Sequence, residues 1–304
     1  MTLGAYLGKE HVDWEFSLIL DGQEVCRYTH APPTIGMRWP PGDDCRFEIP
    51  PTATTLHLHA LKSGLIFDTR HEQSFRLVDT SAETPGLYDR STPFGERMRA
   101  LFDAAQGWEE SGVELRGTPM DSDTRAQVEA RLGHALPNAL VELCTAVGGV
   151  SFGGLGHWLD CDDDLLPLKQ QMDRFGSDYD DFPEWQPVFD SAVFVALEGG
   201  DGIGYLAYVP APNPHCPGEA WFRFHQDGGD FTWLKDADDQ CLDTGAALLR
   251  WFEILLIDAR EINESPAQDT LRIDLTRPHQ HLALRQAWRE DPKRPFRLYV
   301  DSRW

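Results

Sequence analysis

The sequence lacks the features that would place the chain in a membrane or on nucleic acid. No apolar run approaches the ~18 residues of a membrane helix, and the longest candidate is only Ile254 to Ile257. The first fifteen residues show no basic region followed by an apolar one, so we expect no secretory signal. Basic residues are scarce, with 27 Lys and Arg against 50 Asp and Glu, a net charge of −23. A field of that sign repels nucleic acid and anionic membranes.

Closely spaced cysteine pairs are also missing. The six cysteines are scattered and none lies in a CxxC pair, which argues against a zinc ribbon and a dense disulfide scaffold. Cys144 falls in a helical apolar pattern and is interpreted as a small core residue. We therefore expect a cytoplasmic protein in a reducing environment, with no cofactor.

Composition divides the chain into three predicted segments. Residues 1–112 are predicted to form a small β-rich N-terminal domain, with a hairpin turn at Asp21-Gly22, and residues 107–119 a Gly- and Pro-containing linker. Residues 118–258 form the middle domain, which holds 25 acidic and 7 basic side chains and so most of the net charge. Residues 259–304 form a C-terminal extension, with a helix expected near His281–Arg289.

The middle domain follows the order helix, helix, strands, helix. Thr124 and Gln127 have the spacing of a capping box, and Thr244 is expected to cap the last helix. Four strands are expected at residues 192–197, 203–209, 220–224 and 230–234, separated by glycine-rich turns. This order predicts an α+β domain with helices packed on an antiparallel sheet. Its expected core residues are Leu132, Leu140, Leu143, Val147, Leu249 and Phe252.

Several short motifs in this domain occur together in a known order. They are Leu132-Gly133, Leu136-Pro137, Gly148-Gly149, the strand-turn-strand from Val195 to Val209, the strand ending at His225, and AALLRWFEILL. In order and spacing the segment resembles the SUKH superfamily, of Smi/Knr type, over about 140 residues. The resemblance implies a SUKH-like α+β fold and a binding role, because members are commonly immunity proteins that neutralise a cognate toxin without catalytic residues.

Motifs that suggest chemistry occur in the wrong context. Gly149 to Gly153 matches G-x-S-x-G around Ser151, but a nucleophile elbow needs a strand before the serine and a helix after it. The D-x-D-x-D run from Asp160 lacks the later ligands of a calcium loop, and His57 and His59 have no third metal ligand within reach in the sequence. We expect no catalytic residues and no metal site.

The segment from Trp158 to Asp190 combines carboxylates with aromatic rings. It holds ten acidic side chains against Lys169 and Arg174, with six aromatic residues interleaved. This mixture is typical of an interface that steers by charge and anchors by rings; the alternative is that the rings pin the segment to its own core. The predicted partner-binding residues are Trp158, Asp160, Asp162, Asp163, Asp164, Tyr179, Asp180, Asp181 and Trp185.

These patterns predict a bacterial immunity or binding protein rather than an enzyme. The expected partner is a toxin or effector protein with a basic surface, neutralised by occlusion. A regulatory or adaptor module of the same fold is the first alternative, and a serine hydrolase using Ser151 is the second.

Overall fold

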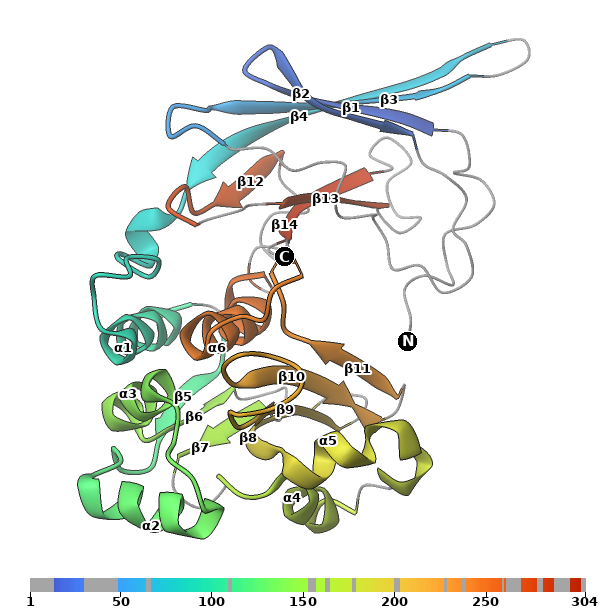
Figure 1. The fold of residues 1–304 in the computed structure, drawn as a ribbon. Coiled ribbons are helices and arrows are strands. Elements are labelled where there is room, and N and C mark those ends of the chain that lie inside the picture. The colour runs from blue at the N-terminus through green and yellow to red at the C-terminus, as the bar shows by residue number, and fades with distance from the viewer. Residues whose placement is uncertain are drawn as a thin grey trace. The chain divides into compact units, whose positions relative to one another are not determined.

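In the computed structural model the chain forms two compact units, the first from residues 1–83 and 253–303 and the second from residues 84–252 (Figure 1). The structure describes residues 14–29, 49–63, 67–108, 111–152, 157–161, 165–176, 179–199, 203–226, 229–236, 239–258, 260, 269–277, 281–286 and 296–301. Within these ranges, every helix is too short or too polar to cross a lipid bilayer.

The first unit contains a five-stranded sheet and a separate pair of strands. The sheet has the order β12 (Thr270–Ile273), β4 (Thr69–Asp79), β3 (Thr55–Lys62), β1 (Trp14–Leu20) and β2 (Gln23–Thr29), and the pair is β13 (His281–Gln286) with β14 (Phe296–Asp301). The predicted hairpin turn is confirmed, because Asp21 and Gly22 join β1 to β2 with positive φ at both residues. The Asp21 carboxylate also accepts hydrogen bonds from the Thr54 and Thr55 amides before β3.

The C-terminal segment completes this sheet and does not stand apart as an extension. β12 pairs in parallel with β4, and its alternating Leu271 and Ile273 are buried in the same core as Phe16 and Leu58. The predicted helix near His281–Arg289 was wrong, since residues 281–286 form β13. The segment HLALRQ alternates apolar and polar residues with the period of a strand.

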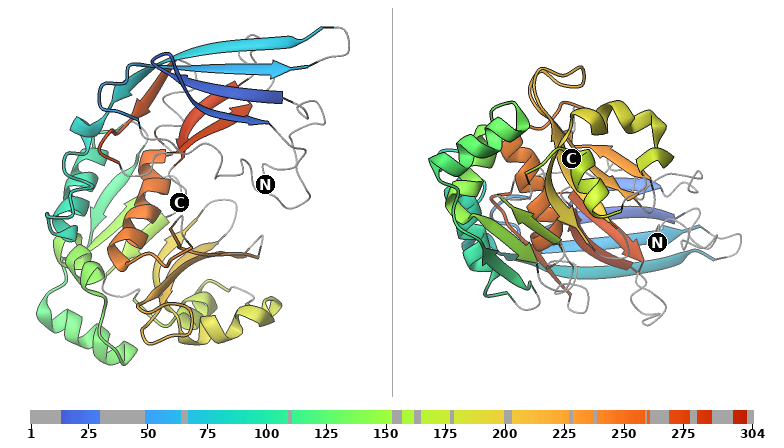
Figure 2. Two further views of the ribbon diagram at one scale, coloured as in Figure 1. Left: turned by 45° about the horizontal axis from the view of Figure 1, so that its top comes forward. Right: turned by 90° about the horizontal axis from the view of Figure 1, so that it is seen from below.

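The second unit is a seven-stranded antiparallel sheet with helices on both faces (Figures 1 and 2). Its strands, in spatial order, are β11 (Asp230–Trp233), β10 (Ala220–His225), β9 (Gly204–Val209), β8 (Val193–Glu198), β7 (His157–Asp160), β6 (Gly149–Phe152) and β5 (Val113–Arg116). Its helices are α1 (Phe94–Ala105), α2 (Ser122–Leu132), α3 (Asn138–Val147), α4 (Leu168–Arg174), η4 (Tyr179–Asp181), η5 (Pro183–Trp185), α5 (Gln186–Ser191) and α6 (Thr244–Phe252), and α6 runs on into η7 (Glu253–Asp258). The predicted α+β class is confirmed.

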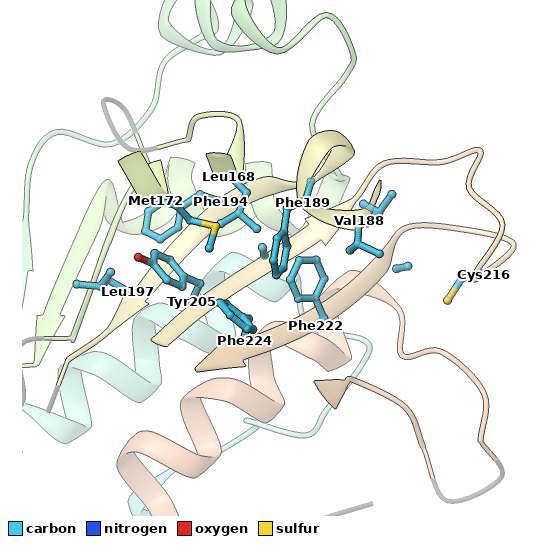
Figure 3. Packing of buried hydrophobic residues seen from close by; sticks show 14 residues of the cluster. Leu168, Met172, Val188, Phe189, Phe194, Leu197, Tyr205, Cys216, Phe222 and Phe224 are labelled. Carbon is cyan, nitrogen blue, oxygen red and sulfur yellow. The ribbon is translucent and has the colours of Figure 1, made fainter. Parts of the chain in front are cut away.

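Alternation along β10 assigns the helices to the two faces of this sheet. Phe222 and Phe224 point into a core shared with α4 and α5, whose Phe189 ring lies 4.9 Å from that of Phe224 (Figure 3). Trp221 points to the other face, where its Nε1 donates to Thr244 of α6 at 3.2 Å. Since both faces are covered over the central strands, β8 and β9 read as continuous buried runs rather than alternating ones.

Most of the predicted core residues of the second unit are buried. Leu140, Leu143, Val147 and Phe252 are at most 3% exposed, while Leu132 and Leu249 are half-buried. The predicted caps were each placed too late. Asp121 caps α2 by accepting from the Thr124 amide, and Asp243 accepts from the Ala246 amide at the start of α6.

The second unit begins earlier than the predicted boundary between residues 112 and 118. β5 lies inside the predicted linker and pairs with β6. α1 packs closely on α3: a Cβ at Gly95 would lie 2.3 Å from the Glu142 carbonyl oxygen, and the Glu142 carboxylate accepts the Phe94 amide at 2.6 Å. The helix assigned to the N-terminal domain therefore belongs with the helices that follow it, because its glycine and its capping carboxylate both serve the contact with α3.

Candidate functional site

Three exposed carboxylates lie close together on η4 and η5. Asp180 and Asp181 are in η4 and Glu184 is in η5, and all three are exposed. No ion pair or hydrogen bond engages them among the described residues, whereas nearby Asp190 of α5 pairs with Lys169 of α4 at 2.5 Å. We call Asp180, Asp181 and Glu184 the acidic triad. Since no described cation neutralises it, its charge faces solvent.

The aromatic residues interleaved with the triad point inward. The Phe182 ring meets that of Phe224 on β10 edge to face at 5.1 Å, and Trp185 stacks on Phe231 of β11 with ring centroids 3.9 Å apart. Such pairs each add about 0.5–1.5 kcal/mol beyond the burial of their area. Phe182 and Trp185 therefore pack against strands of their own sheet. Trp185 is half-buried, and its predicted role as an anchor for a partner stays a prediction.

A glycine makes room for the Phe182 ring. Gly229, just before β11, has φ +61°, and a Cβ there would lie 2.6 Å from Cε1 of Phe182. Both the backbone conformation and the close approach therefore favour glycine. The ring is fixed between Phe224 and the turn before β11, which holds the flanking carboxylates in one place on the surface.

The structure does not bring all the predicted partner-binding residues together. Trp158 and Asp160 lie on β7, four strands away from β11 in the sheet, which is about 19 Å at the usual spacing of about 4.8 Å. Asp160 is half-buried. Asp162, Asp163 and Asp164 lie outside the described residues, as do the side chains of Trp158 and Tyr179. Of the predicted residues, Asp180, Asp181 and Trp185 therefore remain in one short segment, which also contains Glu184.

The motifs that suggested chemistry do not assemble a site in the described part of the chain. Ser151 is 5% exposed within β6, which pairs with β5 and β7, and its Oγ has no hydrogen-bond partner there. Ser151 lies inside the strand and the next element is the strand β7, so the strand-serine-helix order of a nucleophile elbow is not present. His57 contacts Ser74 at 2.8 Å through Nδ1. Among the described residues, no three His, Cys, Asp or Glu side chains are placed to hold a metal ion.

Sequence reasoning missed a buried polar network between β8, β10 and α6. The Glu198 carboxylate accepts hydrogen bonds from Arg223 Nε at 2.6 Å, Arg223 Nη2 at 2.5 Å and Trp251 Nε1 at 2.7 Å. The Glu198 side chain is 8% exposed and that of Arg223 34%. Burial opposes the charge on Arg223, but the facing Glu198 carboxylate raises the Arg223 pKa. The signal was a single charged residue in each of two otherwise apolar strands, VFVALE and AWFRFH.

Disulfides also join segments of the second unit. Cys144 of α3 pairs with Cys161 after β7, with Cα atoms 5.3 Å apart, and Cys216 pairs with Cys241, with Cα atoms 6.1 Å apart. Cys26 of β2 is disulfide-bonded as well. Cys144 is fully buried in the core, as predicted, but it is bonded to Cys161 and is not a free thiol. Because disulfides persist in oxidising compartments, these pairs oppose the expectation of a reducing cytoplasm, which stays a prediction.

Comparison with known proteins gives no relative to reason from. No family model, curated protein or solved structure matches the chain. The resemblance to the SUKH superfamily therefore rests on the motifs and their order alone. The geometry of the second unit is the remaining source of information about function.

Proposed function

We propose that the chain is an immunity-type binding protein that neutralises a cognate bacterial toxin by covering a basic surface of it with the acidic triad. The observation that carries the proposal is the arrangement of the segment Asp180 to Trp185: its carboxylates are exposed, while its half-buried rings pack against β10 and β11. A solvating acidic loop needs no such anchoring. A recognition surface benefits from it, because pre-ordered groups lose less conformational entropy on binding.

The overall charge of the second unit supports a basic partner. Residues 84–252 hold 29 acidic and 11 basic side chains, against 21 and 16 in residues 1–83 and 253–303. The excess of negative charge in one unit steers a basic protein toward it and raises the association rate. A toxin or effector with a basic surface has the complementary chemistry.

The order of elements in the second unit supports the SUKH-like part of the proposal. Leu132-Gly133 ends α2, where Gly133 has φ +79°, and Pro137 immediately precedes α3. Gly148-Gly149 joins α3 to β6, and β8 and β9 form the expected strand-turn-strand. α6 then follows the strands. We propose that residues 84–252 are a SUKH-like domain extended at its N-terminus by α1 and β5.

The test is kinetic, using the partner recovered by pull-down with mass spectrometry from the native host. Asp180→Asn, Asp181→Asn and Glu184→Gln are combined in one variant, and association and dissociation rates are measured at low and high salt. We expect association at low salt to slow about tenfold, within the range known for electrostatic steering, and the difference to shrink as salt screens the charges. Neutralisation of the partner's toxic activity should weaken in parallel.

A matched control removes three other carboxylates. Glu96 on α1, Glu114 on β5 and Asp123 on α2 are exposed, and replacing them by Gln, Gln and Asn changes the net charge by the same amount. If both triple variants slow association equally, net charge rather than the acidic triad is responsible, and the proposed interface is wrong. A partner without toxic activity would instead favour the adaptor function.

A further inference from the structure

The edge of the sheet beside the acidic triad is formed by β11. In the spatial order of the seven strands β11 comes last, and β10 is the one described strand that pairs with it. Trp185 of η5 stacks on Phe231 of β11, so the triad segment packs directly against this edge strand. Among the described residues, the triad therefore lies beside a strand edge with no further strand paired to it.

The hydrogen-bond register shows which backbone groups of β11 point outward. In an antiparallel ladder, successive residues turn their N–H and C=O groups alternately to one neighbour and to the other. The Leu234 amide donates to the Trp221 carbonyl at 2.8 Å, and in the register Thr232 faces Arg223. Thr232 and the Leu234 amide thus face β10, while the Leu234 carbonyl accepts from the Leu242 amide. Phe231 and Trp233 turn their N–H and C=O groups away from β10.

These outward groups have no described partner. Beyond the ladder with β10, no backbone hydrogen bond of Phe231 or Trp233 occurs in the described part of the chain. The strand DFTW has neither the Lys nor the Pro that commonly protects an edge from pairing. The next segment does not close the edge at these residues, because its bridge joins Lys235 to Cys241, beyond the end of β11.

We propose that β11 binds an extended, basic segment of the partner protein as an added strand. This inference deepens the proposed function and rests on it. The backbone of Phe231 and Trp233 offers two donors and two acceptors in the geometry of strand addition. Every second side chain of the added strand would lie on the face of the sheet where Trp185 stacks on Phe231, and Glu184 is the residue next to Trp185 in η5. A lysine or arginine there meets negative charge, whereas the same edge of a second copy of this chain would bring its own triad against the first.

The experiment uses the full chain and two synthetic peptides. The probe is a short, end-blocked peptide of alternating Lys and Val; the control has the same charge, but its central Val residues are replaced by Pro, which prevents a continuous strand. Amide hydrogen exchange is followed by NMR. In the free protein we expect fast exchange at Phe231 and Trp233 and slow exchange at Thr232. With the probe at ten times its Kd, exchange at Phe231 and Trp233 should slow about elevenfold, because it then occurs only from unbound molecules.

The outcomes separate this inference from the proposed function. Equal, salt-sensitive binding of both peptides with fast exchange at Phe231 and Trp233 would keep the acidic triad as a binding surface and overturn strand addition. Binding of neither peptide would also overturn strand addition, and the proposed function would then be judged by its own partner experiment. Protection that appears without peptide and disappears on dilution would identify a second copy as the occupant, which also contradicts the inference.

Discussion

The buried network around Glu198 should be among the most sensitive points of the second unit. Replacing Glu198 by Ala leaves the Arg223 guanidinium without its counter-charge and the buried Trp251 indole N–H without an acceptor. Breaking a buried ion pair costs about 3–5 kcal/mol, and the 34% exposure of the Arg223 side chain places this pair at the lower end of that range. An orphaned buried donor adds about 1–3 kcal/mol. We therefore expect the free energy of unfolding to fall by about 4–6 kcal/mol.

The measurement is equilibrium urea unfolding followed by tryptophan fluorescence, with conservative and matched controls. Glu198→Gln keeps an acceptor oxygen for Trp251 Nε1 and Arg223 Nε but loses the charge and the second acceptor, which faces Arg223 Nη2, so its cost should be about 1.5–3 kcal/mol. Glu184→Ala removes an exposed carboxylate and should change stability by less than about 0.5 kcal/mol. In a double-mutant cycle with Arg223→Leu, the coupling should reach about 1–3 kcal/mol. A coupling below about 0.5 kcal/mol, with a loss under about 1 kcal/mol in Glu198→Ala, would refute the energetic role of the network.

Three further predictions concern a close backbone contact, the hydrogen-bonded Asp21 turn and a disulfide. Gly95→Ala places a Cβ 2.3 Å from a carbonyl oxygen of α3 and should cost about 1–3 kcal/mol in thermal unfolding, whereas Gly218→Ala, with no atom within 4 Å, should cost little. The hydrogen bonds that Asp21 accepts from Thr55 and Thr54 lower its pKa from the ordinary value of about 3.9. They therefore stabilise the fold above the unfolded pKa, and the effect is lost as pH falls through the lower folded pKa. Asp21→Asn should remove that component from an acid titration followed by circular dichroism. Reducing the Cys144–Cys161 disulfide should lower the free energy of unfolding by about 3 kcal/mol, as a Cys144→Ser, Cys161→Ser variant would show; no difference between the variant and the oxidised protein would contradict this.

Local pattern was enough to predict four of the seven strands of the second unit. β8 to β11 begin and end within one residue of the expected bounds, because each is a run of apolar residues between turn signals. Pattern failed where the partner was distant in sequence. β12 follows the strand period, but only its parallel pairing with β4 shows that the C-terminal segment belongs with the N-terminal strands. β5 lies between Gly112 and Gly117, in the segment predicted to be a linker, and it is a strand because it pairs with β6.

The sequence predicted which residue types make up the candidate site, but not which of their side chains point to solvent. The sequence shows that carboxylates and rings alternate near Asp180, but which of them points outward depends on β10 and β11, some forty residues later, whose Phe224 and Phe231 receive the rings. Disulfide pairing is equally non-local. Cys144 and Cys161 lie 17 residues apart, and nothing in that spacing distinguishes a bonded pair from two core thiols.

The stack of Trp185 on Phe231 makes the acidic triad and the edge of β11 parts of one surface, and the two parts act on different steps of binding. The triad is exposed and acts through a field that salt screens over about 8 Å, so it governs the rate of encounter. Backbone hydrogen bonds to β11 form only after contact and are short-ranged, so they govern dissociation. On the proposed function, raising the salt should therefore slow association with the partner and leave its dissociation rate nearly unchanged. A dissociation rate that rises with salt as steeply as association falls would mean that charge pairs, and not strand pairing, hold the complex together.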